Sequence, residues 1–274
     1  MTKNSCLRLY LGAGLTLAAL FTASPAHAQY TPPAIGTPAT GEQFVIEFAG
    51  AYWYPTADIS VASTVGTVIG TDINLKNDLG LTDDNFPMFK IVLKPRAKHK
   101  IRLQYLPVSY SQTVAPARTL TFAGKTFAMN IPVNSTLDWK VYQIGYEYDF
   151  ISSNFMYVGG ILEAKYSDVS ANLTSAVATG SENDKAPFPT VGLIARAYLA
   201  PNLSVTGELT GIKMPSINSF SGHHADVDVY ATLNFTKRIG VQAGYRALDM
   251  AFTSSNDTGS MTLKGAYVGG VVRY

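Results

Sequence analysis

The sequence predicts an all-β fold, an antiparallel up-and-down transmembrane β-barrel of ten strands. Three observations lead to this prediction. About ten segments alternate between apolar and polar residues, as strands with one apolar face do. The connections between these segments are alternately short and long. The N-terminus has the composition of a secretory signal, and no later stretch is apolar for long enough to form a membrane-spanning helix.

The first 28 residues have the three regions of a secretory signal peptide. Lys3 and Arg8 supply the positive region, and residues 9–21 form the apolar core. Residues 26–28, Ala-His-Ala, match a small-residue cleavage site. We therefore expect the mature chain to begin at Gln29 after export through the periplasm.

Cys6 is the only cysteine, and it lies within this signal. The mature chain is expected to contain no disulfide and no catalytic thiol. Residues 29–42 are rich in proline and small residues, which predicts a flexible periplasmic segment. The barrel is expected to occupy residues 43–274.

The alternating segments follow one another from residue 43 to the end of the chain. Residues two apart in a strand share a face, so the apolar face of each segment is expected to contact lipid. Phe44 and Phe48 belong to this face in the first segment, and Tyr142 and Ile144 belong to it in the fourth. The expected strands are 43–54, 87–95, 100–110, 137–149, 155–168, 189–199, 203–213, 225–236, 239–250 and 261–274.

Aromatic residues are expected at both ends of the apolar faces, where a barrel meets the two membrane–water interfaces. At the outer ends these are Tyr54, Trp139 and Tyr166. At the inner ends they are Tyr148, Phe150, Phe155 and Tyr274.

The connections fall into two classes. The tight ones are 96–99, 150–154, 200–202 and 237–238. The long ones are 55–86, 111–136, 169–188, 214–224 and 251–260. Short periplasmic turns and longer outer loops are typical of outer-membrane barrels. An even number of strands then places both ends of the barrel in the periplasm.

The first two long connections contain alternating pieces of their own. Residues 59–61 and 73–75 alternate, and residues 119–122 and 125–129 indicate a hairpin. We interpret these pieces as strand extensions above the membrane. A barrel of eight strands with extended hairpins is an alternative. A soluble β-sandwich would also alternate, but the signal and the loop asymmetry favour the barrel.

The last alternating run, residues 265–274, stops on an aromatic residue. An exported chain with such a final strand resembles small bacterial outer-membrane β-barrel proteins of the opacity type. The resemblance covers residues 43–274, is one of architecture, and transfers no functional residue. It implies an outer-membrane location, contact with lipid and lipopolysaccharide, and recognition of Tyr274 by the barrel-assembly machinery. It leaves the oligomeric state and any surface partner open.

The net charge excludes a nucleic-acid partner. Lys and Arg number 21 and Asp and Glu number 19, so loss of Lys3 and Arg8 with the signal leaves a formally neutral chain. No basic face is present. Charged residues make up 15% of the chain, compared with about 25% in soluble domains, as expected when much of the surface faces lipid.

The charges within the expected strands fall on the faces opposite to the apolar ones and should point into the barrel. A buried charge is costly unless it is paired, and a narrow barrel is filled by its side chains. Mixed signs therefore predict a cross-linked polar plug rather than an open pore. We expect a barrel that is not an enzyme and serves a surface or envelope role. Limited passage of small solutes is an alternative. The expected lumen residues are Glu47, Lys90, Arg102, Glu147, Glu163, Lys165, Arg196, Glu208, Asp228, Arg246 and Arg273.

Three pairs of these residues are expected to be in charge contact, directly or through a shared neighbour. They are Arg102 with Glu147, Arg196 with Glu208, and Glu47 with Arg273.

Residues 223–228, His-His-Ala-Asp-Val-Asp, introduce a different possibility. The omptin family of outer-membrane proteases uses an Asp–His pair and an Asp pair at the barrel rim. This chain is similar in residue types only, with Asp83 and Asp84 as the second pair. A hydrolase of lipid or peptide at the outer rim, using His224, is therefore the alternative function.

No cofactor or metal is predicted. The acidic run 72–84 has a lysine at a ligand position and lacks the turn glycine of a calcium loop. The sequence also shows no glycine-rich phosphate loop and no metal-ligand spacing.

Overall fold

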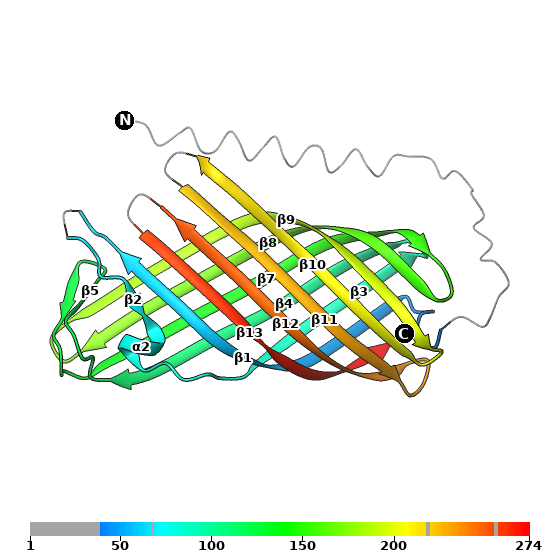
Figure 1. Cartoon of the computed structure of the whole chain (residues 1–274), viewed down its shortest axis with the longest axis horizontal. Coiled ribbons are helices and arrows are strands. Elements are labelled where there is room, and N and C mark those ends of the chain that lie inside the picture. The colour runs from blue at the N-terminus through cyan, green and yellow to red at the C-terminus, as the bar shows by residue number, and fades with distance from the viewer. Residues whose placement is uncertain (1–38, 67, 218–219, 255–256) are drawn as a thin grey trace. The chain divides into compact units, whose positions relative to one another are not determined.

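The computed structural model describes residues 39–274, except 67, 218–219 and 255–256. The expected signal peptide and most of the proline-rich segment lie outside the described residues. Ten long strands form one antiparallel sheet that closes on itself (Figure 1). They are β1 (Ile46–Ser63), β3 (Phe86–Arg96), β4 (His99–Val114), β7 (Val133–Ser152), β8 (Met156–Ser175), β9 (Thr179–Ala200), β10 (Leu203–Ile217), β11 (Phe220–Asn234), β12 (Ile239–Thr253) and β13 (Asp257–Arg273).

Closure comes from the pairing of β13 with β1. Their register runs from Glu47 opposite Arg273 to Ser63 opposite Asp257. The other neighbours follow chain order around the sheet. The prediction of a ten-stranded up-and-down barrel is confirmed. The eight-strand alternative is excluded, because each expected strand is present.

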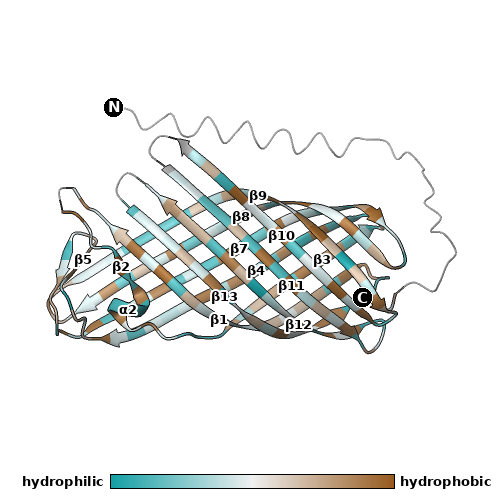
Figure 2. Cartoon of the chain, in the orientation of Figure 1, coloured by the Kyte–Doolittle hydropathy of each residue, from teal (hydrophilic) through white to brown (hydrophobic). Residues whose placement is uncertain are grey.

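The alternation in the sequence becomes an alternation of environment. On β7, Val141, Gln143 and Glu147 are buried inside the barrel, while Tyr142 and Ile144 are exposed on its outer surface. Figure 2 shows the resulting change of hydropathy along each strand. Such an apolar outer face is stable only against hydrocarbon, as in a membrane barrel.

The strands continue beyond the apolar outer belt and carry small accessory elements. β2 (Ile73–Asn74) pairs with β1, and the short helix α2 (Leu75–Leu79) follows it. The Asn74 side chain accepts the N–H of Asn77, and Gly80 ends the helix in the left-handed conformation. Among the described residues, no helix is long and apolar enough to span a membrane.

The expected hairpin forms from β5 (Leu120–Phe122) and β6 (Lys125–Phe127). Ala123 and Gly124 both have positive φ, as a two-residue hairpin turn requires. The interpretation of this hairpin as an extension of barrel strands is wrong. β5 and β6 form a separate two-stranded sheet, because Leu120, Phe122 and Phe127 are buried in the core rather than exposed on an extended wall.

The outer half of the barrel is therefore filled by an apolar core, which we call the outer core. Leu75 and Leu79 of α2 and the apolar side chains of the β5–β6 hairpin pack there with inward-facing residues of the wall. Trp53 and Trp139 are among the latter, and neither is exposed. The expectation that Trp139 lies in the outer girdle is wrong. It has the parity of the inward residues Val141 and Gln143, and its ring N–H donates to Ser167 Oγ at 2.6 Å.

The inner end differs from expectation at residues 39–42. The N–H of Thr40 donates to the carbonyl of Pro201 at 2.6 Å, and Asn234 donates to the carbonyl of Thr40 at 2.6 Å. Glu42 forms an ion pair with Arg196 at 2.7 Å. The structure describes four residues of the segment expected to be flexible, and in these residues Thr40 and Glu42 are in contact with the barrel.

Candidate functional site: the charged lumen and the outer mouth

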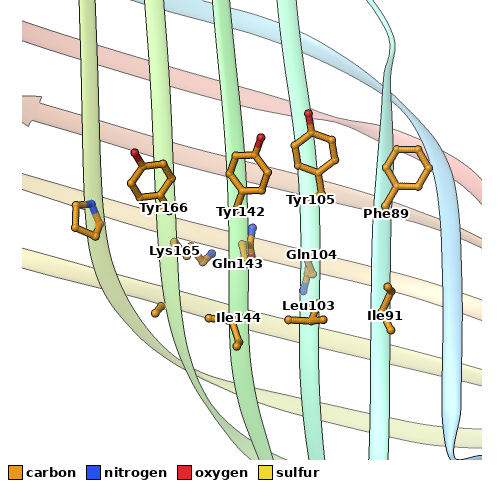
Figure 3. Close-up of a pocket in the computed structure, with 12 residues that line it drawn as sticks. Phe89, Ile91, Leu103, Gln104, Tyr105, Tyr142, Gln143, Ile144, Lys165 and Tyr166 are labelled. Carbon is orange, nitrogen blue, oxygen red and sulfur yellow. The ribbon is translucent and has the colours of Figure 1, made fainter. Parts of the chain in front are cut away.

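The lumen residues occupy inward positions because strand parity puts them opposite the lipid-facing rows. Figure 3 shows this for three strands. Tyr105, Tyr142 and Tyr166 lie in a row on one side of the ribbon, and Gln104, Gln143 and Lys165 lie on the other. Nine of the eleven expected lumen residues are buried, and Lys90 and Asp228 are half-buried.

Arg102 forms the centre of the network. Its guanidinium donates to Glu147 at 2.9 Å and also to Glu208. β4 and β10 are separated by three strands around the wall, so the second contact crosses the lumen. Lys90 donates to Glu208 at 2.7 Å. The expected pair of Arg102 and Glu147 is in direct contact.

Lys100 and Asp149 extend this cluster and were not expected in it. Lys100 Nζ lies 2.6 Å from Glu147 and 2.9 Å from Asp149, and both Lys100 and Asp149 are buried. They have the same parity as Arg102 and Glu147, so the alternation contained the signal. Both residues were left out of the expected network because they lie at the ends of the expected strands, beside tight turns.

The second expected pair is joined through a shared neighbour. Arg196 donates to Tyr230 Oη at 3.4 Å, and that hydroxyl donates to Glu208 at 2.9 Å. The charge partner of Arg196 is Glu42, from the segment before the barrel.

The third expected pair is in direct contact at the inner end. Arg273 Nε lies 2.5 Å from Glu47, and Arg273 Nη1 donates to Asn234 at 2.6 Å.

A second group of charges lies nearer the outer mouth. Arg246 makes two hydrogen bonds to Asp226, at 2.9 and 2.7 Å. Lys165 lies 3.4 Å from Asp226 and 3.5 Å from Glu163. Asp228 instead accepts a hydrogen bond from Tyr267 at 2.9 Å. Asp226 was not expected in the lumen network. It lies between Arg246 of β12 and Lys165 of β8 and contacts both side chains.

The spaces left inside the network are small. One cavity, beside Gln143, Glu163 and Asp226, has a volume of about 10 Å³. Another, beside Met88, Gln242 and Tyr267, has about 40 Å³. A cavity needs about 10–15 Å³ to hold one water. The first space therefore matches one water and the second a few waters, and neither matches a larger solute.

The two rim histidines have different partners. His223 interacts with Asp249 at 2.7 Å on the outer surface. His224 is buried, and its Nε2 lies 3.0 Å from the Lys165 ammonium. The ammonium can only donate, so Nε2 accepts and the imidazole is neutral.

Asp83, the other half of the hydrolase hypothesis, has different neighbours. It accepts the N–H of Ala57 at 3.0 Å and lies 3.5 Å from Lys76. Within the described part of the chain, no contact joins Asp83 or Asp84 to His224, and no three His, Cys, Asp or Glu side chains are grouped to bind a metal ion.

The comparisons with known proteins identify the architecture. No family model and no curated protein sequence matches this chain. The outer-membrane protease OmpT of Escherichia coli has a TM-score of 0.54 at 8% identity, covering 87% of this chain and 99% of OmpT. The toluene transporter TodX of Pseudomonas putida has a TM-score of 0.38 at 9% identity, covering 88% and 93%.

The attachment invasion locus protein Ail of Yersinia pestis, in complex with sucrose octasulfate, has a TM-score of 0.35 at 9% identity, covering 84% of this chain and 99% of Ail. At such identities, the similarity to OmpT shows a shared fold and nothing about activity. The chain has the fold of a bacterial outer-membrane β-barrel.

Proposed function

We propose that this protein is a non-enzymatic outer-membrane barrel whose lumen is closed and whose work is done by its outer surface. The observation that supports this most directly is the contact from Arg102 to Glu208 across the lumen. A side chain that joins opposite walls occupies the axis that a solute would need.

The closure has two layers of different chemistry. The inner layer is the charge network around Arg102, whose side chain is 1% exposed. The outer layer is the outer core, where α2 and the β5–β6 hairpin pack against the wall. A hydrated ion meets paired charges in one layer and buried apolar side chains in the other. Each layer would have to rearrange before a solute could pass.

The outer elements are held together as a defined surface. Arg118 makes two hydrogen bonds to Asp78 of α2, both at 2.7 Å, and a third to the carbonyl of Asp72 at 2.7 Å. These bonds tie the connection after β4 to the connection after β1. A fixed surface of this kind suits contact with neighbouring lipopolysaccharide or with another macromolecule at the cell surface.

Liposome swelling tests the proposal. Vesicles containing the refolded protein are placed in isotonic sugars and amino acids of increasing size, beside empty vesicles and vesicles containing an open porin. We expect the swelling rate of the empty vesicles. A rate that falls with solute size, as for the porin, would contradict the closed lumen and support the passage of small solutes.

The hydrolase alternative requires a separate measurement. Wild type and His224→Ala are incubated with lipopolysaccharide, phospholipid and a peptide library, and products are followed by mass spectrometry. We expect no product from either protein. A product formed by wild type and lost in His224→Ala would replace the proposed function with the enzymatic one.

A further inference from the structure

The barrel wall is open between β9 and β10 at its outer end. The register between these strands ends at Val191 opposite Gly211. Beyond this point β9 pairs with β8 as far as Thr179, and β10 pairs with β11 as far as Ile217. Figure 1 shows the outer ends of β9 and β10 leading away from each other. We call this opening the β9–β10 gap.

The sequence at the gap opposes closure by hydrogen bonding. Continuing the antiparallel register from Val191 and Gly211 would place Pro189 opposite Lys213 and Pro187 opposite Pro215. Proline has no backbone N–H and is confined to strand edges for this reason. Three prolines in two facing segments therefore maintain two unpaired edges.

A chamber of about 350 Å³ lies behind the gap. Its walls combine residues of β8 and β9 with residues of β10, β11, β12 and β13. The apolar contribution includes Val169, Phe188, Met214, Met250 and Phe252. This volume lies within the range of small-molecule sites, roughly 300–1,000 Å³. Asp184, Lys185 and Asp257 also line the chamber, so its lining suits a hydrocarbon chain that carries a polar head.

On its periplasmic side, the chamber is closed by His224 and the lumen charges beneath it. His224 lines it, and this side chain interacts with Lys165, which belongs to the outer group of lumen charges. The His224 Nδ1 atom is buried and has no hydrogen-bond partner among the described residues. The ring of Phe188 lies 5.2 Å from the His224 ring. A ligand in the chamber would therefore contact His224 and Phe188 and could not pass from the chamber into the lumen.

A groove on the lipid-facing surface lies next to the chamber. This exterior groove has a volume of about 480 Å³ and is bordered by Tyr105, Tyr142 and Tyr166 (Figure 3). Pro187 lines both the groove and the chamber. Below the gap, the neighbouring outward residues are apolar and exposed, Val191 at 63% among them. Beside the gap itself, Lys185, Lys213 and His223 are exposed, so the gap lies where the apolar belt gives way to polar residues, as at the boundary between hydrocarbon and head groups.

A second gap in the wall shows what a covered opening looks like. β3 begins at Phe86, so the outer end of β4 has no β3 partner. α2 lies against β1 and β4 there, and Leu75 and Leu79 are buried. The β9–β10 gap has no such cover among the described residues and leads to the chamber instead.

We propose that the β9–β10 gap is a side entrance through which the hydrocarbon chain of a membrane amphiphile enters the chamber from the outer leaflet. The chain lies first along the exterior groove, passes Pro187, and ends between Phe188 and Met214. The protein then holds this chain above its closed lumen. This binding site goes beyond the proposed closed barrel, and its presence or absence does not decide whether the lumen conducts.

Photo-crosslinking in lipid vesicles tests the side entrance. The probe is lauric acid that carries a diazirine at its methyl end, and adducts are mapped by mass spectrometry after irradiation. We expect adducts on the peptides that contain Phe188 and Met214. Adducts confined to lipid-facing residues outside the gap, such as Leu103 and Ile144, would overturn the proposal.

A reversible lock across the gap supplies the matched comparison. The variant carries Pro189→Cys and Lys213→Cys, with Cys6, the only native cysteine, replaced by serine. These positions are two residues beyond the last paired residues, Val191 and Gly211, so the disulfide draws the two edges together at the inner end of the gap. Oxidation should abolish the chamber adducts, and reduction should restore them. Unchanged adducts in the oxidised protein would overturn entry through the gap.

Two further variants separate closure of the gap from other effects of introducing a disulfide between β9 and β10. Leu193→Cys with Leu209→Cys places a disulfide where β9 and β10 already pair, so the chamber adducts should persist. Met214→Trp fills the chamber without any cysteine and should remove the adducts. Chamber adducts that persist in Met214→Trp would contradict the site itself, and heat-modifiable migration on gels verifies that each variant is folded.

Discussion

Replacing Arg102 by methionine should strongly destabilise the barrel without opening it. Methionine fills much of the same volume but removes the charge that Glu147 and Glu208 share. Arg102 and Glu147 are 1% and 3% exposed at their side chains, so water cannot replace the lost partner. The perturbation therefore tests the centre of the lumen network.

The expected magnitude follows from the burial of the carboxylates. Removing one member of a buried ion pair typically costs about 3–5 kcal/mol, because the other charge stays buried. Here Lys100 remains beside Glu147 and Lys90 remains beside Glu208, at 2.6 and 2.7 Å. We therefore expect a loss near the lower limit, about 3 kcal/mol.

Urea unfolding of the barrel in lipid vesicles measures this loss. Arg96→Met is the matched control, because Arg96 is exposed near an inner turn, and its effect should stay within about 0.5 kcal/mol. Adding Glu208→Gln to Arg102→Met should cost less than the sum of the two changes, because the two residues are in contact. A loss below about 1 kcal/mol for Arg102→Met would refute the view that buried charges hold the walls together.

Three other changes test other parts of the structure. Gly244→Ala should destabilise by about 1–3 kcal/mol in the same unfolding assay, because the added methyl would lie 2.6 Å from Tyr230 and 2.7 Å from Tyr267; a neutral effect would show that the wall there is loosely packed. Leu103→Arg should cost about 2–4 kcal/mol if this exposed residue lies near the midplane, and a neutral result would place it outside the hydrocarbon region. The hydrogen bond from Arg118 lowers the pKa of Asp78 below its usual value; the resulting stabilisation is therefore present above about pH 4 and is lost as the pH falls through the lowered pKa. Limited proteolysis of the outer connections should show this loss in wild type and no such pH dependence in Asp78→Asn.

The strand pattern was predictable because the two faces of the wall meet different solvents. Apolar residues face lipid and charged residues face the lumen, so the two kinds alternate along each strand. On β7, Tyr142 is exposed on the outer face and Glu147 is buried on the inner one. Trp139 shows the limit of reasoning from residue type. Its parity placed it inside, whereas its aromatic character suggested a girdle. The parity was the stronger signal.

The outer core was not predictable from the same pattern. Leu79 and Phe127 come from connections that are far apart in the sequence, and they become neighbours only when the barrel closes. Glu42 was missed for a similar reason. Its partner Arg196 is 154 residues away, and nothing in the proline-rich sequence around it indicates a buried carboxylate.

The β9–β10 gap lies between these two cases. Pro187, Pro189 and Pro215 are visible in the sequence and mark strand edges. Which edges face each other follows only from the register. β9 pairs with β8 as far as Thr179 but with β10 only as far as Val191. This difference in paired length leaves the opening in front of the chamber.

Planar-bilayer conductance tests the closed lumen most directly. Single barrels of wild type and of Arg102→Met are inserted and held at constant voltage, beside an open porin as the positive control. The two-layer account predicts no resolvable current steps from wild type, and none from Arg102→Met, because the outer core still blocks the axis after the charge network is weakened. Uniform ohmic steps from the wild-type barrel would contradict the account and show a continuous water path through the charges.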